Sequence, residues 1–267
     1  MAAGGGVIAA VQAVELATAK SHKPAKLGIA APHPDAPAVT STVDEVAASF
    51  PALLRPHPVV GSGTAVAMAE AWVGAARGAS DVVYFGVTEH ATAGILRDGL
   101  PVTGAHGRAP AVAWLSLNPV DRDDYRRTGC LDAEVSAAGI VRRLVWRIKA
   151  GDASRVRDMV SGDLAAITVD QILAAARDRD GVSSSVMRDT ARYLGMAAAN
   201  LVSIVDPEVL VLGGIMASAA DLLLEPLRTE LTRRLAAPMA DALTIRTASL
   251  GGDAAALGAA RRALISD

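Results

Sequence analysis

Aromatic residues are scarce in this sequence: Phe, Trp and Tyr make up 3% of its 267 residues. A hydrophobic core must therefore be built mainly from Ala, Val, Leu and Ile. There is one cysteine, Cys130, which excludes an intramolecular disulfide and a metal site made only of thiolates. A single thiol is compatible with a reducing compartment.

The sequence also lacks a strong excess of one charge and a long apolar run. Its net charge of −2 gives no sign of the basic patch that nucleic-acid-binding proteins usually carry. No window holds the roughly 18 uninterrupted apolar residues of a membrane span, and the first residues lack the basic stretch of a signal peptide. We therefore expect a cytoplasmic protein without a nucleic-acid or membrane partner.

Short apolar runs alternate with amphipathic stretches, which predicts an α/β fold. Strands are expected over residues 26–31, 57–60, 81–87, 93–97, 111–117, 208–212 and 243–247. Helices are expected over 7–20, 44–54, 63–77, most of 131–205, 217–236 and the residues after 252. Asp98 and Gly99 predict a hairpin turn. Gly213 and Gly214 end a strand before a helix, a position where phosphates are commonly held.

Several segments together are more informative than any one of them. They are AEAWVGAARGASDVVYFGV at 69–87, ILRDGLPVTGAHGRA at 95–109, TGCLDAEVSAAGIV at 128–141, NLVSIVDPEVLVLGGIM at 200–216 and LGGDAAALGAA at 250–260. In this order and spacing they resemble the ROK family of sugar kinases and repressors, over roughly residues 26–265. The resemblance implies a two-lobed, actin-like (ribonuclease-H-like) fold.

The same resemblance implies the domain organisation. Residues 1–62, joined by the C-terminal helix 252–267, would form a truncated N-terminal lobe, and residues 63–251 a larger C-terminal lobe. Family members commonly pair through the larger lobe, so a homodimer is expected. We expect no counterpart of the N-terminal DNA-binding segment that the family's repressors carry.

The resemblance further shows where the residues of a kinase are replaced. The family's catalytic Asp lies in an Asn-Asp-Ala-Asn stretch that GSGT at 61–64 matches, so Ser62 stands where the carboxylate should be. A serine hydroxyl needs an activating partner to act as a base near neutral pH. Ser62 or Thr64 is more simply interpreted as the cap of the following helix.

The expected phosphate cradle is replaced as well. The family's glycine-rich hairpin is matched by TEHATAG at 88–94, where side chains would crowd the phosphates and Glu89 would add a negative charge. The family's N-terminal Asp-x-Gly-x-Thr hairpin has no counterpart before residue 7. We therefore expect neither kinase activity nor a nucleotide cofactor.

The acceptor and zinc elements of the family are also changed. Residues 110–114 match the family's Gly-Glu-Ile-Gly-His element, which places Trp114 where the family has a zinc-binding histidine. The loop before Gly129 has no cysteine cluster, so Cys130 is the one thiol that remains, and we expect no structural zinc. Asp132 matches a family glutamate and is one methylene shorter.

The replacements suggest two hypotheses of different classes. His33, Glu89, His90 and Trp114 map to the cleft between the lobes of the family fold. Two histidines, a carboxylate and an aromatic wall suit proton transfer. The first hypothesis is therefore an ATP-independent isomerase, cyclase or lyase acting on a small, partly apolar organic substrate. Its predicted catalytic residues are His33, Glu89 and His90, and its predicted substrate-binding residues are Ser62, Thr64, Trp114 and Asp132.

The second hypothesis is a pseudokinase that binds a ligand or a partner without catalysis. Each replacement has a simpler interpretation that fits it. His33 would lie in a tolerant loop, Glu89 and His90 at a solvent-facing hairpin edge, and Trp114 in the volume left by zinc. An open pocket lined by these residues would favour chemistry, and a cleft closed around Trp114 would favour a scaffold.

Overall fold

The computed structural model describes residues 28–31 and 58–265, and the structural statements that follow refer to these residues. The helices predicted over 7–20 and 44–54, and the predicted catalytic residue His33, lie outside them. None of the described helices combines the length and the hydropathy that crossing a bilayer requires.

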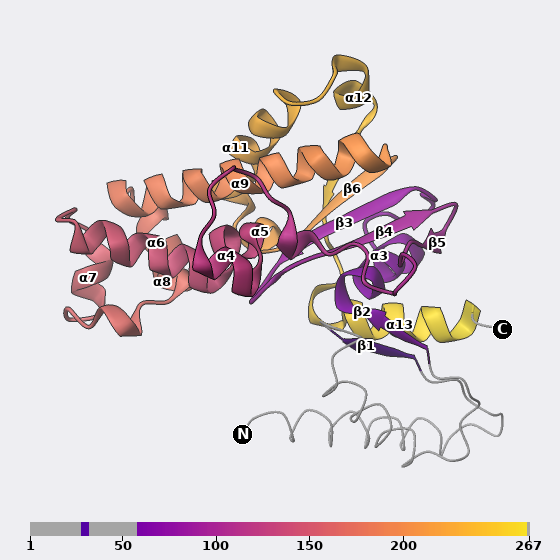
Figure 1. Ribbon diagram of the computed structural model, residues 1–267, viewed down its shortest axis with the longest axis horizontal. Coiled ribbons are helices and arrows are strands. Elements are labelled where there is room, and N and C mark those ends of the chain that lie inside the picture. Colours follow the sequence, from indigo (N-terminus) through magenta and orange to yellow (C-terminus); the bar gives the residue numbers. More distant parts are fainter. Residues whose placement is uncertain (1–27, 32–57, 266–267) are drawn as a thin grey trace, which may run out of the picture.

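A five-stranded mixed sheet with the order β5-β4-β3-β6-β7 forms the centre of the fold (Figure 1). Strands β3 (Val82–Val87), β6 (Val209–Gly214) and β7 (Thr244–Thr247) run parallel to one another. Strands β4 (Ala91–Arg97) and β5 (Leu100–Pro101) continue the sheet in antiparallel pairs. Because β3 and β6 are central and covered on both faces, their apolar residues are almost continuously buried.

The hairpin between β4 and β5 turns where the sequence predicts it. Asp98 and Gly99 both have positive φ, 52° and 74°, which two-residue hairpin turns of this type require. The strand predicted over 111–117 is wrong. A 3₁₀ helix (Val112–Trp114) forms there instead. Val112 is buried in the main core, so packing rather than strand pairing satisfies the apolar pattern of this segment.

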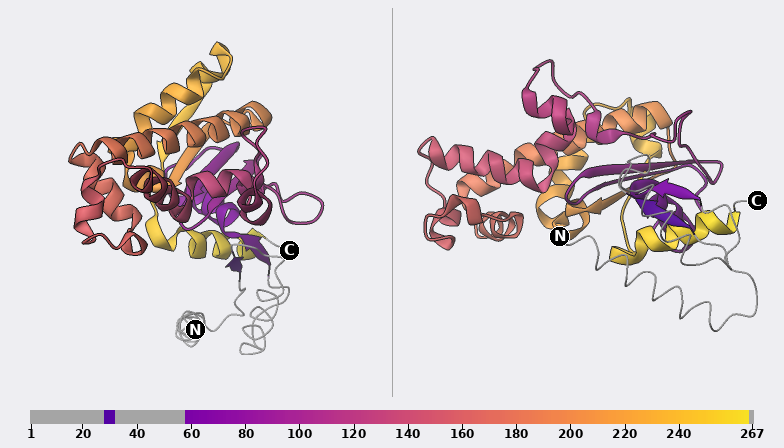
Figure 2. Two further views of the ribbon diagram at one scale, coloured as in Figure 1. Left: turned by 60° about the vertical axis from the view of Figure 1, so that its left-hand side comes forward. Right: turned by 60° about the horizontal axis from the view of Figure 1, so that its bottom comes forward.

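One face of the sheet is covered by α3 (Ser62–Val73), and α13 (Ala254–Ile265) packs along α3 (Figures 1 and 2). A second, two-stranded parallel sheet of β1 (Ile29–Ala31) and β2 (Val59–Gly61) lies against this helix pair. The approach is close, because a Cβ at Gly258 of α13 would lie 1.7 Å from the carbonyl oxygen of Ala65 in α3.

The larger core lies among the helices of residues 123–242, some of which contact the sheet. They are α4 (Asp123–Thr128), α5 (Cys130–Val135), α6 (Ala137–Lys149), α7 (Arg155–Met159), α8 (Val169–Arg177), α9 (Gly181–Val205), α10 (Ile215–Ser218), α11 (Ala220–Thr232) and α12 (Ala237–Ala242). Further 3₁₀ turns are Leu164–Ala166 and Gly251–Asp253. The predicted division at residue 62 into two lobes stays a prediction.

Side-chain caps set several of these helix starts. Ser136 accepts a hydrogen bond at the start of α6 and Asp180 at the start of α9, and Thr168 forms a capping box with Gln171 at the start of α8. The helices are interrupted at Gly151 and Gly162, and both glycines have positive φ. The local sequence therefore determines the ends of these helices directly.

Candidate functional site

A pocket of about 590 Å³ opens at the N-terminal end of α3. Its walls come from parts of the chain that are far apart in sequence, namely residues 61–64, 90–93 and 107–114 together with Arg127, Thr128 and Asp132. Of the predicted site residues, Ser62, Thr64, His90, Trp114 and Asp132 line this one pocket. Trp114 is 56% exposed, so the pocket is not closed around its ring.

His90 and Asp132 form a hydrogen-bonded pair in this pocket. Nδ1 of His90 lies 2.9 Å from Oδ2 of Asp132, and the other carboxylate oxygen accepts the backbone N–H of Ala91 at 2.6 Å. Asp132 is 3% exposed, whereas the side chain of His90 is 54% exposed. A carboxylate only accepts hydrogen bonds, so the shared proton belongs to Nδ1 and Nε2 is the nitrogen that can exchange a proton with a ligand.

The start of α3 differs from the expectation that Ser62 or Thr64 caps it. Gly61 is the N-cap residue, and no side chain accepts a hydrogen bond from the first turn. The capping interpretation of Ser62 and Thr64 is therefore wrong. The reason is that α3 starts directly after β2, so both residues already belong to its first turn.

Glu89 and His90 are neighbours in the turn between β3 and β4, and both were predicted to be catalytic, but only His90 lines the pocket. It is exposed between β3 and β4 and is absent from the lining of the pocket. His90, the next residue, turns towards Asp132. The catalytic role of Glu89 stays a prediction without support from the geometry.

The β3–β4 turn does not fit the phosphates of a nucleotide. The N–H of Thr88 donates to the carbonyl of His90 at 3.2 Å, and the N–H of Ala91 donates to Asp132. These backbone donors are satisfied within the protein, whereas a phosphate cradle needs them for the ligand. A smaller, mainly apolar pocket of about 360 Å³ adjoins Thr88 and Gly214.

The described residues do not fit a zinc ion either. Cys130 is buried against Tyr125 and Ala133. Among residues 28–31 and 58–265, no three His, Cys, Asp or Glu side chains gather in a way that could hold a metal. The absence of structural zinc in the whole protein stays a prediction.

Charged side chains occupy the region beside Cys130 instead. The carboxylate of Glu134 is buried and accepts hydrogen bonds from the Tyr125 hydroxyl at 2.7 Å and from Arg122 Nη1 at 3.0 Å. Arg142 and Arg143 also face this carboxylate, at 3.8 and 3.9 Å. Burial raises the pKa of Tyr125 to about 12, and the charge of Glu134 adds to the effect, so the hydroxyl stays a donor.

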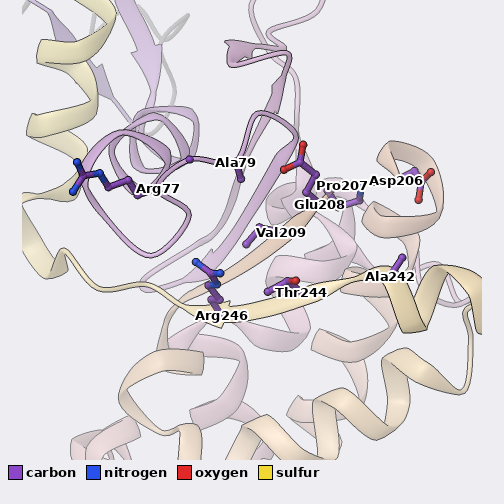
Figure 3. A pocket seen from close by; sticks show the side chains of 10 residues that line it. Arg77, Ala79, Asp206, Pro207, Glu208, Val209, Ala242, Thr244 and Arg246 are labelled. Atoms are coloured by element: carbon purple, nitrogen blue, oxygen red, sulfur yellow. The ribbon is translucent and has the colours of Figure 1, made fainter.

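A second hollow, of about 560 Å³, lies at the opposite ends of the parallel strands (Figure 3). Glu208 reaches into it from the start of β6, and Thr244 and Arg246 from β7. Arg246 donates through Nη1 to the carbonyl of Ala75 at 2.6 Å, which ties β7 to the segment after α3. The side chains that line this second hollow carry charges of both signs, and among them no acidic side chain pairs with a basic one. We therefore place the candidate site in the pocket at α3.

Fold and site together define an α/β protein of the actin-like type, with a pocket at the start of α3 that apolar and charged side chains line. The model of the ROK family matches residues 57–265, and the chain belongs to this family. The fold class and the family resemblance predicted from the sequence are therefore confirmed.

Individual relatives agree with this assignment. The chain is 29% identical over 194 residues to a glucokinase from Halalkalibacterium halodurans, which covers 72% of this chain and 58% of that protein. It is 28% identical over 160 residues to the DNA-binding transcriptional dual regulator NagC of Escherichia coli, covering 60% of this chain and 38% of the regulator. The chain thus spans about 40 to 60% of the length of these relatives.

Solved structures show the same fold. A ROK family transcriptional regulator homologous to Escherichia coli MLC superposes with a TM-score of 0.78 at 22% identity, covering 97% of this chain and 68% of the regulator. A ROK family glucokinase from Streptomyces griseus, solved with glucose and AMPPNP, superposes with a TM-score of 0.75 at 24% identity, covering 96% of this chain and 88% of the enzyme. Because two of these proteins regulate transcription, the expected lack of a nucleic-acid partner stays a prediction.

Sequence reasoning missed two features of the site. It assigned Asp132 to the substrate and did not predict its hydrogen bond with His90, 42 residues earlier. It also assigned no role to Arg108 and Arg127, which line the same pocket. Arg127 follows another arginine in the short polar helix α4, where no sequence pattern distinguishes a pocket residue from a surface residue.

Proposed function

We propose that the pocket at α3 carries out ATP-independent acid/base chemistry on a small organic substrate, with His90 as the proton-transferring group. The observation that supports this most directly is the His90–Asp132 hydrogen bond in an open pocket. Asp132 is a positioning residue, since it orients the ring and would stabilise the imidazolium that forms when Nε2 takes up a proton.

An isomerisation needs no further reagent in such a site. Nε2 of His90 would take a proton from a carbon next to a carbonyl group, and the electron pair of that C–H bond would form an enolate. Where that carbon also carries a hydroxyl group, the enolate is an enediolate. The hydroxyl proton then passes to the former carbonyl oxygen, and the proton on Nε2, or one exchanged with water, returns to the former carbonyl carbon, so that the carbonyl group moves by one carbon. Trp114 would supply an apolar wall, and Ser62 and Thr64 hydroxyl groups for polar parts of the substrate.

The first prediction concerns solvent exchange. Incubation in D2O with a panel of small aldoses, ketoses and keto acids should replace one C–H proton of a substrate with deuterium, which ¹H NMR detects as a lost signal. His90→Gln and Asp132→Asn should both lower this rate, His90→Gln by about 100-fold or more, because a positioned acid/base typically contributes that factor.

His106→Gln is the matched control for these variants. His106 is an exposed histidine in the loop just before the 107–114 wall and does not line the pocket, so this variant should exchange at the wild-type rate. Circular dichroism would show that all three variants are folded. Wild-type exchange rates in both His90→Gln and Asp132→Asn would show that this site is wrong.

The alternative is a non-catalytic protein that binds a ligand in the same pocket. Relatives named as xylose and N-acetylglucosamine repressors favour it, because their names describe regulation by small molecules rather than turnover. A panel member that raises the melting temperature of the protein without any deuterium exchange would support this alternative. Assembly as a homodimer remains part of the proposal in either case.

The second prediction is that Mg-ATP leaves the melting temperature unchanged. A ligand that binds only the folded state must raise it, and the N–H groups of Thr88 and Ala91 are already donated within the protein. The measurement is a thermal-shift titration with Mg-ATP, alone and with hexoses and N-acetylhexosamines. A saturable shift with the nucleotide would contradict our description of the β3–β4 turn.

A further inference from the structure

We propose that the ligand of the pocket at α3 carries an aromatic ring, which packs against the indole of Trp114 while the carbonyl group of the ligand lies at His90. The inference rests on the proposed function, because it names the class of substrate for the same site, an aryl-substituted ketone or aldehyde. Binding of the ring does not depend on proton transfer by His90, so the two can fail separately.

The wall of the pocket that carries Trp114 is apolar. It consists of the consecutive residues 109–114, Ala-Pro-Ala-Val-Ala-Trp, all of which line the pocket. Apart from the indole N–H, none of these side chains can donate or accept a hydrogen bond. The backbone N–H groups of Ala109 and Trp114 are already donated, to the carbonyls of Thr103 and Ala111. A ligand group that contacts this wall therefore gains by burying apolar surface rather than by forming hydrogen bonds.

Trp114 combines an exposed ring with an anchored backbone. Its ring is 56% exposed, whereas Val112 in the same 3₁₀ turn is buried in the main core. The turn also lies directly on Gly129 at the start of α5, where a Cβ would be 2.2 Å from the carbonyl oxygen of Ala113. An aromatic side chain on an ordered backbone binds at a low cost in conformational entropy, and aromatic rings attract one another in offset and edge-to-face arrangements.

The hydrogen-bonding side chains of the pocket lie outside residues 109–114. Among them are the paired His90 and Asp132, and Ser62 and Thr64 in the first turn of α3. A sugar ring carries hydroxyl groups around its edge, and those facing residues 109–114 would lose their hydrogen bonds to water. An aromatic ring has no such groups to lose. The pocket therefore suits a molecule with one polar and one aromatic end.

The test compares two ketones that differ only in the ring, 4-phenyl-2-butanone and 2-butanone. The chain has three tryptophans, and Trp114→Ala identifies the indole N–H signal of Trp114 in a ¹H–¹⁵N spectrum by its loss. We expect 4-phenyl-2-butanone to shift this signal saturably and to bind about 10-fold or more tightly than 2-butanone. The signals of Trp72 and Trp146, which do not line the pocket, should stay in place.

Trp114→Ala should weaken the binding of 4-phenyl-2-butanone by about 10-fold, because the contact between the two rings is lost. Ligand-observed NMR measures this affinity without the indole signal. Trp146→Ala is the matched control, since it removes an exposed indole from α6, outside the pocket, and should leave the affinity unchanged.

Equal affinities for the two ketones, equal losses in the two variants, or no saturable shift of the Trp114 signal would overturn the inference. Saturable binding that prefers the ring, without deuterium exchange next to the carbonyl group, would contradict the proposed chemistry and leave the inference standing. Deuterium exchange that His90→Gln abolishes, on ketones bound without any preference for the ring, would leave the chemistry standing and overturn the inference.

Discussion

Replacing Glu70 by alanine is expected to lower the free energy of unfolding by about 3–5 kcal/mol. Glu70 is fully buried. Its Oε1 accepts the N–H groups of Ser249 and Leu250 at 2.8 and 3.1 Å, and its Oε2 accepts the N–H of Ala75 at 2.6 Å and the Ser249 hydroxyl at 3.1 Å. Alanine would leave these buried donors unpaired, and each such donor costs about 1–3 kcal/mol.

Chemical unfolding in urea, followed by circular dichroism, measures this effect. Glu225→Ala removes an exposed glutamate from α11 and should change the stability by less than about 0.5 kcal/mol. Burial, together with the charge of Glu70, raises the pKa of Tyr84 to about 12, so Glu70→Ala should also let Tyr84 ionise at lower pH. A loss no larger than that of Glu225→Ala would contradict the assigned role.

Glu70 also connects two parts of the fold that are far apart in the sequence. Its hydrogen bonds join the end of α3 to the loop that leads into α13, 179 residues further along the chain. These two helices pack along each other, and α3 contacts the sheet and begins at the pocket. The carboxylate is therefore a structural link between the two ends of the described chain.

Replacing Glu134 by alanine is expected to destabilise the protein by about 3–5 kcal/mol. The variant would leave Arg122 and the largely buried Arg143 without the carboxylate that both of them face. Removing one partner of a buried ion pair costs more than the pair itself contributes, because the remaining charge stays desolvated. Glu134→Gln should lose less, since the amide oxygen can still accept the hydrogen bond of the Tyr125 hydroxyl.

Asp123→Ala is the control for this prediction. Asp123 also pairs with an arginine, Arg126, but its side chain is 89% exposed, and an exposed pair contributes only about 0–1 kcal/mol. Urea unfolding of the two variants compares a buried with an exposed carboxylate in the same segment. Similar stabilities of Glu134→Ala and Asp123→Ala would show that the buried pairs do not stabilise the loop.

The Glu134 cluster connects stability with the candidate site. Arg127 and Thr128 end α4, and Asp132 lies in α5 two residues before Glu134. The cluster fastens these two short helices to each other and to α6 through Arg142 and Arg143. Glu134→Ala should consequently also loosen the wall of the pocket that α4 and α5 form.

The sequence by itself determined the central strands of the sheet and the family. The runs at 81–87 and 208–212 are apolar because they form central strands buried on both faces. Asp98 and Gly99 specify a hairpin turn through their positive φ angles. Such features are local, so the residues that produce them are neighbours in the sequence.

Only the tertiary structure decided how the candidate site is assembled. It pairs His90 with Asp132, brings Arg127 to the same pocket, and leaves the start of α3 without the cap that Ser62 or Thr64 was expected to provide. It also replaced the strand predicted over 111–117 by a 3₁₀ turn that buries Val112. These outcomes depend on contacts between residues tens of positions apart, and local propensity contains no information about such contacts.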